Sequence, residues 1–303
     1  MKVAVMGAGA VGGYFGALLH RGRMDVSLIA RGPHLQAIKA RGLHIKSYQG
    51  DFTVPAKAVG DPREIGPVDL ILFCVKSYDT ESAARQCLPI IREGTAILSL
   101  QNGVDNEEKI GVIAGVEKVL GGVAYIGAGV SAPGVIMHTA EGRIVFGEMT
   151  GGISDRGRRL ERILREAGLP IELSPDIQAA LWRKLCWNAA FNAINALVGG
   201  EVDILVRRPE GEALARAVMD EVRAVGASQG VHLPDDAADK LLHWTATAAT
   251  GMKTSMRQDL EAGRRLEVDA LNGVVVQRGQ AAGIPTPYNF TLYALLKAID
   301  APC

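Results

Sequence analysis

Hydrophobic residues follow two different patterns along this chain of 303 residues. In the first half, short continuous apolar runs alternate with segments of helical spacing, which predicts buried parallel strands joined by helices. Farther along, the strand pattern nearly disappears and helical spacing continues. The pattern predicts a doubly wound α/β domain over 1–173 and a smaller all-α domain over 174–303. The predicted buried strands are 2–6, 25–30, 68–75, 95–100 and 119–124.

The segments between these strands predict the remaining elements of the first domain. Helical spacing marks 33–40, 80–88 and 154–167, and alternation over 43–59 predicts a small hairpin or meander. After the glycine-rich stretch 127–134, the short apolar runs 135–138 and 144–146 are expected to form an antiparallel pair at the sheet edge, and 171–173 to close the sheet. The next residues, Ser174 and Pro175, predict the cap and first residue of the helix that opens the second domain.

The first strand is followed at once by a glycine-rich turn. A strand, this turn and a helix over 11–21 form the order that a dinucleotide site requires. The first glycine allows the tight turn, the second lets the backbone approach a pyrophosphate, and the third lets the helix pack closely. A merely tight strand-to-helix turn is the alternative. The motif predicts a Rossmann-type domain that binds its cofactor through Gly7, Ala8, Gly9, Ala10, Val11 and Gly12.

Three more residues follow predicted strands, at the edge where α/β sheets place their ligands. An NAD site usually has Asp or Glu about 20 residues after the glycines, but here the second strand is followed by Arg31. A guanidinium at this position favours the 2′-phosphate of NADP, and an ordinary surface arginine is the alternative. Lys76 and Asn102 each follow one of the next buried strands, where they would face the cofactor or the reacting centre. A solvated loop lysine and simple turn chemistry are the alternatives for these two.

The first helix of the second domain carries a line of polar residues on an otherwise apolar surface. Four residues fall within an arc of roughly 80° at about 100° per residue, namely Lys184, Asn188, Asn192 and Asn195. Burying an Asn amide without a partner costs about 1 to 3 kcal/mol, and Asn is a mediocre helix former. Exposed helix faces usually carry Glu, Lys, Arg and Gln. The line therefore favours a binding site over a solvated face.

A lysine in such a site suits the reduction of a carbonyl group. As hydride reaches the carbon, negative charge builds on the oxygen, which an ammonium group can stabilise and then protonate. Neutral Asn amides can hold a carboxylate or hydroxyl without adding a charge that disturbs the lysine pKa. Ser255 is either a helix N-cap or a ligand contact. Glu267 and Asp269 lie in a partly apolar helical pattern, which does not decide between ordinary surface acids and site residues.

Composition limits the classes of partner. With 33 basic and 33 acidic residues the formal net charge is zero, so the chain has no electrostatic footprint for nucleic acid or an anionic membrane. The four cysteines show no paired spacing, which predicts reduced thiols in a cytoplasmic protein. The six histidines match no metal-ligand spacing, so no metal is expected. One of them, His138, lies in a strand pattern and is expected to be structural.

Taken together, these motifs resemble the ketopantoate reductase (2-dehydropantoate 2-reductase) family over essentially the full length. The matching pieces are 7–12, Arg31, 74–76, 101–103, the helix with Lys184, Asn188 and Asn192, 255–256 with Asp259, 267–269, and 272–273. The resemblance implies NADPH-dependent reduction of a small 2-oxoacid, 2-dehydropantoate, to (R)-pantoate, a step towards pantothenate and coenzyme A. It leaves a homodimer open.

The resemblance also implies roles for individual residues. Lys184 matches the family's proton donor, and Glu267 matches a carboxylate placed near cofactor and substrate. The implied substrate contacts are Asn188, Asn192 and Ser255, and the implied cofactor contacts include Arg31, Asn102 and Ala128. One departure concerns a further asparagine that the family often has near a turn, where this chain has the sequence VGGEV at 198–202. Asn195 is a candidate replacement, and otherwise the pocket differs.

Other functions stay open. A paralogous NADPH-dependent reductase of another branched 2-oxoacid would share all these motifs. A β-hydroxyacid dehydrogenase also has a Lys-x-x-x-Asn helix, but the glycine-rich segment that precedes the lysine in those enzymes is missing from 174–183. A non-catalytic NADPH-binding sensor would keep the glycine loop and Arg31 without needing Lys184.

Overall fold

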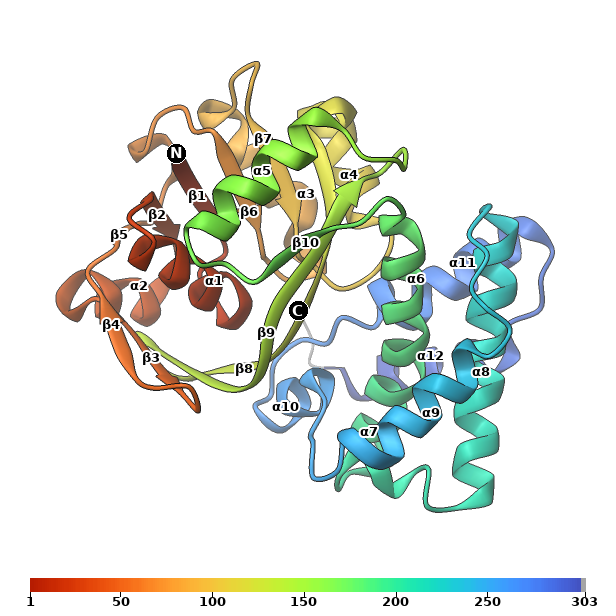
Figure 1. Ribbon diagram of the computed structural model, residues 1–303. Coiled ribbons are helices and arrows are strands. Elements are labelled where there is room, and N and C mark those ends of the chain that lie inside the picture. Colours follow the sequence, from red (N-terminus) through yellow and green to blue (C-terminus); the bar gives the residue numbers. More distant parts are fainter. Residues whose placement is uncertain (301–303) are drawn as a thin grey trace. The chain divides into compact units, whose positions relative to one another are not determined.

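The computed structural model describes residues 1–300, and the contacts within the chain divide it into two compact units (Figure 1). The first unit comprises Met1–Gln101 and Asn106–Ile177, and the second comprises Asn102–Asp105 and the chain from Gln178 onward. The short segment Asn102–Asp105 thus groups with the helical unit by its contacts, although it follows a strand of the first. Cys303, one of the cysteines expected to be reduced, lies outside the described residues.

The first unit is built on one mixed sheet. Its strands are β1 (Lys2–Met6), β2 (Asp25–Ile29), β3 (Leu43–Ser47), β4 (Phe52–Val54), β5 (Lys57–Val59), β6 (Leu70–Phe73), β7 (Ala96–Ser99), β8 (Val119–Ala132), β9 (Val135–Glu148) and β10 (Ile171–Leu173). Their order across the sheet is β4-β3-β9-β8-β7-β6-β1-β2-β5, and β10 pairs with β9. From β8 to β5 every neighbouring pair is parallel. The predicted Rossmann-type sheet, with all five buried strands, is confirmed.

Helices cover both faces of this sheet, which explains why its central strands are continuously apolar. Side chains alternate across a strand, so Val3 and Val5 of β1 enter one core while Ala4 and Met6 enter another. The first core also contains residues of three helices, α1 (Ala10–Arg21), α2 (Gly32–Arg41) and α5 (Asp155–Glu166). The second contains residues of α3 (Thr80–Cys87) and α4 (Asn106–Ala114), which lie on the opposite face of the sheet (Figure 1). The predicted helices 33–40, 80–88 and 154–167 are confirmed as α2, α3 and α5.

The antiparallel part of the sheet differs from the prediction. β8 and β9 form one long hairpin, so 135–138 and 144–146 are two parts of a single strand and do not pair with each other. This strand is not at the edge, because β3 pairs with its first part and β10 with its last part. The stretch 127–134 extends the hairpin because its glycines allow close approach. A Cβ on Gly127, for example, would lie 2.8 Å from the Thr139 hydroxyl oxygen of the paired strand.

Three smaller predictions had different outcomes. Segment 43–59 contains the predicted hairpin, formed by β3 and β4, but its last strand, β5, pairs in parallel with β2 at the other edge of the sheet. The closing strand 171–173 is present as β10. The helix expected to begin at Pro175 begins at Ile177. The Ser174 hydroxyl accepts a backbone N–H two residues on and closes a turn, so it does not cap the helix.

The second unit is all-helical among its described residues, as predicted. Its α-helices are α6 (Ile177–Trp187), α7 (Ala193–Val198), α8 (Pro209–Ser228), α9 (Ala237–Ala248), α10 (Ser255–Glu261), α11 (Val274–Ala282) and α12 (Pro287–Ile299). Two π-helical turns interrupt this series: η5 (Asn188–Asn192) joins α6 to α7, and η7 (Asp269–Gly273) leads into α11. Such turns are rare and frequently occur at functional sites.

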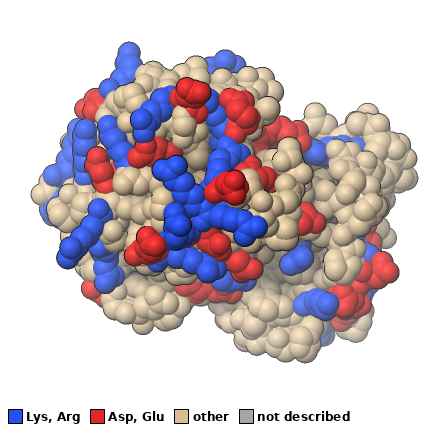
Figure 2. Space-filling model, turned by 45° about the horizontal axis from the view of Figure 1, so that its top comes forward, with Lys and Arg blue, Asp and Glu red and all other residues tan. Residues whose placement is uncertain are grey.

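The surface carries charges of both signs. Acidic side chains lie among the basic ones over the face drawn in Figure 2, in line with the formal net charge of zero. Within residues 1–300, no helix has both the length and the apolar character needed to cross a membrane.

A buried carboxylate joins two helices of the second unit. Glu221 of α8 is 9% exposed and accepts the backbone N–H groups of Tyr288 and Asn289 at the start of α12, both at 2.9 Å. The Asn289 amide also donates to it, at 2.7 Å. Thr286, at the N-cap position of α12, makes no capping bond with its own side chain. Glu221 therefore satisfies the helix end from a neighbouring helix, where a negative charge also suits the helix dipole.

Replacement of this carboxylate should destabilise the protein. In Glu221→Ala, two backbone N–H groups at the start of α12 lose their acceptor and the Asn289 amide loses one of its two, the other being the carbonyl oxygen of Val218. We expect the free energy of unfolding to fall by about 3 kcal/mol. Glu212→Ala is the matched control, because Glu212 lies on the same helix but forms an exposed pair with Arg216 and should change stability by less than about 0.5 kcal/mol. Urea denaturation of both variants gives the comparison. Equal losses would show that Glu221 does not cap α12.

Candidate active site

The glycine loop joins β1 to α1, and its three glycines have different surroundings. Gly7 has φ +95°, and a Cβ there would lie 2.8 Å from the backbone nitrogen of Val75. A Cβ on Gly12 would lie 2.3 Å from the carbonyl oxygen of Gly7, so only glycine allows α1 to pack this closely. Gly9 is the N-cap residue of α1, and a Cβ there would meet nothing within 4 Å. The backbone at Gly9 is therefore open, which suits the approach of a pyrophosphate to the helix N-terminus.

Arg31 follows β2 after one residue and occupies the N-cap position of α2. Its side chain is 78% exposed, and its Nη2 lies 2.6 Å from Oδ2 of Asp79, just before α3. Asp79 could not be predicted from the sequence, because no motif marks a residue that holds a guanidinium from another loop. A guanidinium has five N–H donors, and this pair uses one nitrogen. The first turn of α2 has no acidic residue, so the helix end and Arg31 both suit an anionic group such as a 2′-phosphate.

Lys76 and Ala128 lie elsewhere in the first unit. Lys76 follows β6 and precedes the short 3₁₀ turn Ser77–Asp79, and its carbonyl accepts the N–H of Asp79 at 2.9 Å. Lys76 is thereby close along the chain to the partner of Arg31. Ala128 is half-buried in β8 and pairs with His138 of β9.

His138 has the surroundings of a structural histidine, as expected. It is 1% exposed, its Nδ1 lies 2.9 Å from the Ser47 hydroxyl, and its Nε2 lies 3.0 Å from the Glu141 carbonyl oxygen. Burial lowers the pKa of its imidazole. A neutral ring with both nitrogens engaged supports the hairpin and needs no ligand.

These features of the first unit fit NADP. The backbone at Gly9 is open where a pyrophosphate would approach, and Arg31 stands at the strand end where NAD sites have a carboxylate. Gly7–Gly12, Arg31 and Lys76 lie on segments that follow neighbouring parallel strands. They are thus at one edge of the sheet, the edge where α/β folds bind ligands.

In the second unit, the helix with the polar line is not one α-helix. α6 ends at Trp187, residues 188–192 form the π turn η5, and α7 continues the chain. The predicted arc is wrong across η5, because a π turn bonds residue i to i+5 and is wider than an α-helical turn. Asn188 and Asn192 are nevertheless 5% and 2% exposed, which excludes a solvated face. The buried Oδ1 of Asn192 has no hydrogen-bond partner among the described residues, so a substrate donor would satisfy it.

Two of the predicted residues, Lys184 and Asn102, interact with a third, Glu267. Lys184 is half-buried, and loss of water around its ammonium group lowers its pKa to about 8, while the charge of Glu267 acts in the opposite direction. Glu267 is 7% exposed, and its Oε2 lies 3.5 Å from the amide nitrogen of Asn102. Asn102 belongs to the segment that groups with the second unit. A partly desolvated ammonium, a buried carboxylate and an amide form a plausible acid–base group.

The two π turns are connected by a side chain whose role the sequence did not reveal. Asn272 of η7 donates from Nδ2 to the carbonyl oxygen of Ala189 in η5, at 2.9 Å, and to Oδ1 of Asn289, at 3.0 Å. Asn272 and Asn289 are both fully buried. Through Asn289 this chain of bonds reaches Glu221. The turn that carries Asn188 and Asn192 is therefore held by buried amides. In the sequence, residues 272–273 were only a piece that matched the family, with no role assigned.

Local hydrogen bonds answer one open question about Asn195 and one about Ser255. Asn195 donates to the Gly200 carbonyl at 3.2 Å and accepts from the N–H and hydroxyl of Thr254 at 3.2 and 3.1 Å. Its amide is thus used within the fold. The N-cap of α10 is Thr254, whose hydroxyl accepts the N–H of Arg257 at 3.3 Å. The N-cap alternative for Ser255 is therefore wrong, and Ser255 is an exposed residue in the first turn of α10.

Asp269 and Glu267 differ in how far their carboxylates are exposed to solvent. The Asp269 side chain is 55% exposed, accepts the Tyr293 hydroxyl at 2.8 Å and pairs with Lys297 at 3.4 Å. Asp269 is thus the surface acid of the two, and Glu267 is the buried one.

The described cysteines are free thiols. Burial raises the pKa of Cys87 and Cys186 to about 12 and that of Cys74 further still, so none of these thiols is activated as a nucleophile. Residues 1–300 contain no group of three His, Cys, Asp or Glu side chains placed to hold a metal ion.

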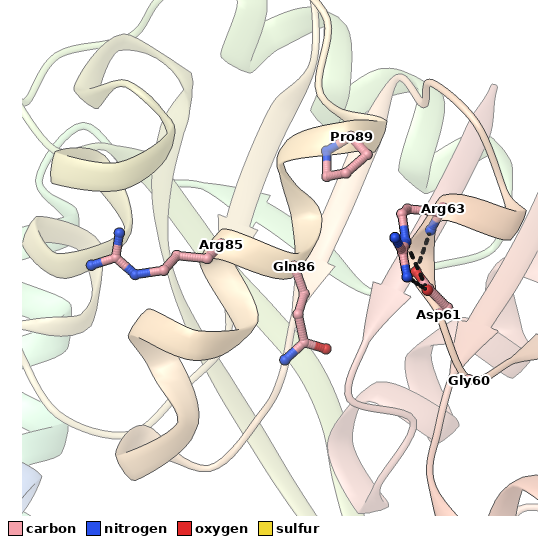
Figure 3. A pocket seen from close by; sticks show the side chains of 6 residues that line it. All are labelled: Gly60, Asp61, Arg63, Arg85, Gln86 and Pro89. Atoms are coloured by element: carbon pink, nitrogen blue, oxygen red, sulfur yellow. Dashed lines mark hydrogen bonds and ion pairs between the residues drawn. The ribbon is translucent and has the colours of Figure 1, made fainter.

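A surface hollow of about 420 Å³ in the first unit does not coincide with the predicted site. It is lined by Gly60, Asp61, Arg63, Arg85, Gln86 and Pro89. In Figure 3, Asp61 and Arg63 pair with each other, and Arg85 points away from them. None of the predicted site residues lines this hollow.

A Rossmann-type sheet with a glycine loop, followed by a helical unit with a half-buried lysine, is the architecture of a nicotinamide-dependent oxidoreductase. The comparison with family models is more specific. The model described as "Ketopantoate reductase PanE/ApbA" matches residues 3–151, and "Ketopantoate reductase PanE/ApbA C terminal" matches residues 176–300. The chain belongs to the ketopantoate reductase family of oxidoreductases, and the resemblance found in the sequence is confirmed.

Individual relatives match the whole chain. A curated 2-dehydropantoate 2-reductase of Mesorhizobium japonicum is 34% identical and aligns over 100% of this chain and 99% of its own. The crystal structure of a PanE/ApbA family ketopantoate reductase from Ralstonia eutropha is 41% identical, with a TM-score of 0.92 over 99% of this chain and 98% of that one. A structure of D-mandelate dehydrogenase with NADH and anilino(oxo)acetate is 26% identical, with a TM-score of 0.93 and the same coverage. The predicted fold class is confirmed.

Proposed function

We propose that this chain reduces 2-dehydropantoate to (R)-pantoate with NADPH, in the synthesis of pantothenate and coenzyme A. The observation that carries this proposal is the half-buried Lys184, with its pKa lowered to about 8, beside the buried Glu267. The names of the family and of the curated relatives support the substrate.

The first unit holds the cofactor in this proposal, and the second supplies the substrate groups, in the division expected for domains 1–173 and 174–303. The loop Gly7–Gly12 binds the pyrophosphate and Arg31 binds the 2′-phosphate. Lys76, Asn102 and Ala128 contact other parts of the cofactor. NADPH, when bound, supplies the hydride.

The residues of the second unit then hold the 2-oxoacid and supply the proton. The Lys184 ammonium stabilises the negative charge that develops on the carbonyl oxygen and donates its proton to that oxygen. The charge of Glu267 favours the ammonium form, which keeps Lys184 protonated near neutral pH in spite of desolvation. Asn188, Asn192 and Ser255 bind the carboxylate and hydroxyl groups of the substrate through neutral donors and acceptors.

A second candidate is reduction of a different 2-oxoacid. The D-mandelate dehydrogenase structures show that this fold also occurs with NADH and an aromatic oxoacetate. The asparagine that many family members have near 198–202 is absent here, and Asn195 is occupied within the fold. This difference bears on substrate identity and favours a paralogous reductase of another 2-oxoacid as the second candidate.

A substrate panel tests the proposed function directly. The purified protein should oxidise NADPH fastest, by kcat/KM, with 2-dehydropantoate, compared with other branched and with phenyl-substituted 2-oxoacids. A higher kcat/KM with one of those acids would assign the chain to the second candidate. Tight NADPH binding without turnover of any acid would contradict both and indicate a sensor.

Lys184→Ala tests the proton donor. We expect kcat/KM for reduction to fall by about two to four decades, the usual contribution of a general acid, while NADPH still binds. Because the donor must be protonated, the wild-type rate should be constant well below pH 8 and fall about tenfold per pH unit above the Lys184 pKa of about 8. This fall should be absent from the residual activity of Lys184→Ala.

Lys240→Ala is the control for this substitution, because Lys240 is a 72% exposed lysine of the same unit. It should leave both the rate and the pH profile unchanged. A Lys184→Ala enzyme with wild-type rate, or with the same fall above pH 8, would show that another group donates the proton.

Arg31→Ala tests the choice of cofactor. Loss of the guanidinium should raise the Kd for NADPH by about ten- to a hundredfold and leave the Kd for NADH nearly unchanged, because only NADPH carries the 2′-phosphate. Arg23→Ala, at an arginine of the same unit before β2, is the control. If the preference for NADPH survives in Arg31→Ala, this residue does not bind the phosphate.

The location and assembly belong to the same proposal. We infer a cytoplasmic enzyme, from the unpaired cysteines and the biosynthetic role. We infer a homodimer from an apolar stripe on α12, where Tyr288, Leu295 and Ile299 are exposed at a spacing that places them on one helix face. Light scattering should give twice the mass of one chain; the mass of a single chain would exclude the dimer.

A further inference from the structure

His34 links two segments of the first unit that are far apart in the sequence. It lies in the first turn of α2, three residues after Arg31, and is half-buried. Its Nε2 lies 2.9 Å from the carbonyl oxygen of Ala8, in the glycine loop. Its Nδ1 accepts the backbone N–H of Gly134, in the turn between β8 and β9, at 3.0 Å.

The two partners determine the tautomer of this ring. A backbone N–H only donates, so the nitrogen that faces Gly134 carries no hydrogen. A carbonyl oxygen only accepts, so the nitrogen that faces Ala8 carries one. The neutral imidazole therefore has both of its polar atoms engaged, and it connects the glycine loop with the hairpin turn through a rigid ring.

The hairpin turn is held tightly at this point. Gly134 has φ +77°, and a Cβ there would lie 2.9 Å from Cβ of Ala37 in α2. Its carbonyl oxygen accepts the N–H of His44 at 2.9 Å. Ile136 lies in β9, just after this turn, and its side chain would be 3.2 Å from a Cβ on Gly13 of α1. The turn is thus fixed against α2, while β9 packs on α1, the helix that follows the glycine loop.

We propose that His34 is a positioning residue for the dinucleotide. It holds Ala8, and with it the open backbone at Gly9, in a fixed relation to the helix that bears Arg31 and to the hairpin that bears Ala128. The inference rests on the proposed function in one respect, that the ligand is NADPH. His34 bonds to the loop and not to a group unique to NADP, so it supports the binding of NADPH and NADH alike.

Binding measurements without substrate test this role. In His34→Ala the glycine loop loses its bond through Ala8 and the hairpin turn loses its bond through Gly134. We expect the Kd values of NADPH and NADH to rise by the same factor, about tenfold. The kcat at saturating NADPH should stay within about twofold of wild type. Arg31→Ala should instead change the Kd of NADPH alone. Gln36→Ala, at an exposed position of the same helix, is the matched control and should change neither.

His34→Gln is the second variant, because a Gln amide nitrogen can take the place of Nε2 and still donate to Ala8. It should recover part of the lost affinity for both dinucleotides. Equal weakening by His34→Gln and His34→Ala would overturn the role of the Ala8 bond. An effect on NADPH alone, or a loss of thermal stability and kcat with unchanged Kd values, would overturn the positioning role as a whole. If the wild type binds NADPH but reduces no 2-oxoacid, the proposed function fails and the His34 comparison still stands.

Discussion

The approach of α1 to the sheet is the constraint on which the first unit depends. Three glycines of this helix lie against its neighbours. A Cβ on Gly12 would lie 2.3 Å from the Gly7 carbonyl oxygen, one on Gly13 would lie 3.2 Å from Ile136, and one on Gly16 would lie 2.9 Å from Leu28. With larger residues the helix would have to move outward, and both the glycine loop and β9 would lose their support. The cofactor loop is therefore a consequence of helix packing as much as a ligand-binding motif, and the same closeness brings the hairpin turn within reach of His34.

In the second unit the main constraint is the free-energy cost of burying polar groups. Lys184, Asn188 and Asn192 would each lower stability if packing alone determined the sequence. Two π turns and the bonds from Asn272 to Ala189 and Asn289 hold this polar region in place. The network ends on Glu221, which also closes the start of α12. Residues remote from the chemistry thus fix the backbone that presents it, a usual division between a reactive site and its supporting shell.

The sequence predicted those structural features that are determined by residues close together in the chain. Continuous apolar runs identified the buried strands, and the glycine spacing identified the loop, because both depend on nearest neighbours. The long β8–β9 hairpin was missed, since glycines that allow close cross-strand contact, such as Gly127, have the same local signal as glycines in loops. The π turns were missed because the same residues fit an α-helix. The contacts of Asn102 with Glu267 and of His34 with Gly134 join positions far apart in sequence, and no periodicity encodes them.

Substrate choice is decided by fewer residues than the fold is. The D-mandelate dehydrogenase structure has a TM-score of 0.93 to this chain, so the same architecture accommodates different 2-oxoacids. In the proposed function the difference comes from side chains around the lysine, and the resemblance leaves one asparagine of the family unmatched near 198–202. Asn195 does not replace it, because Gly200 and Thr254 occupy its amide, and the guanidinium of Arg257 lies next to Gly199 in the same turn. Under the proposed function, this turn is therefore the part of the second unit where we expect the choice of acid to differ from that of the family.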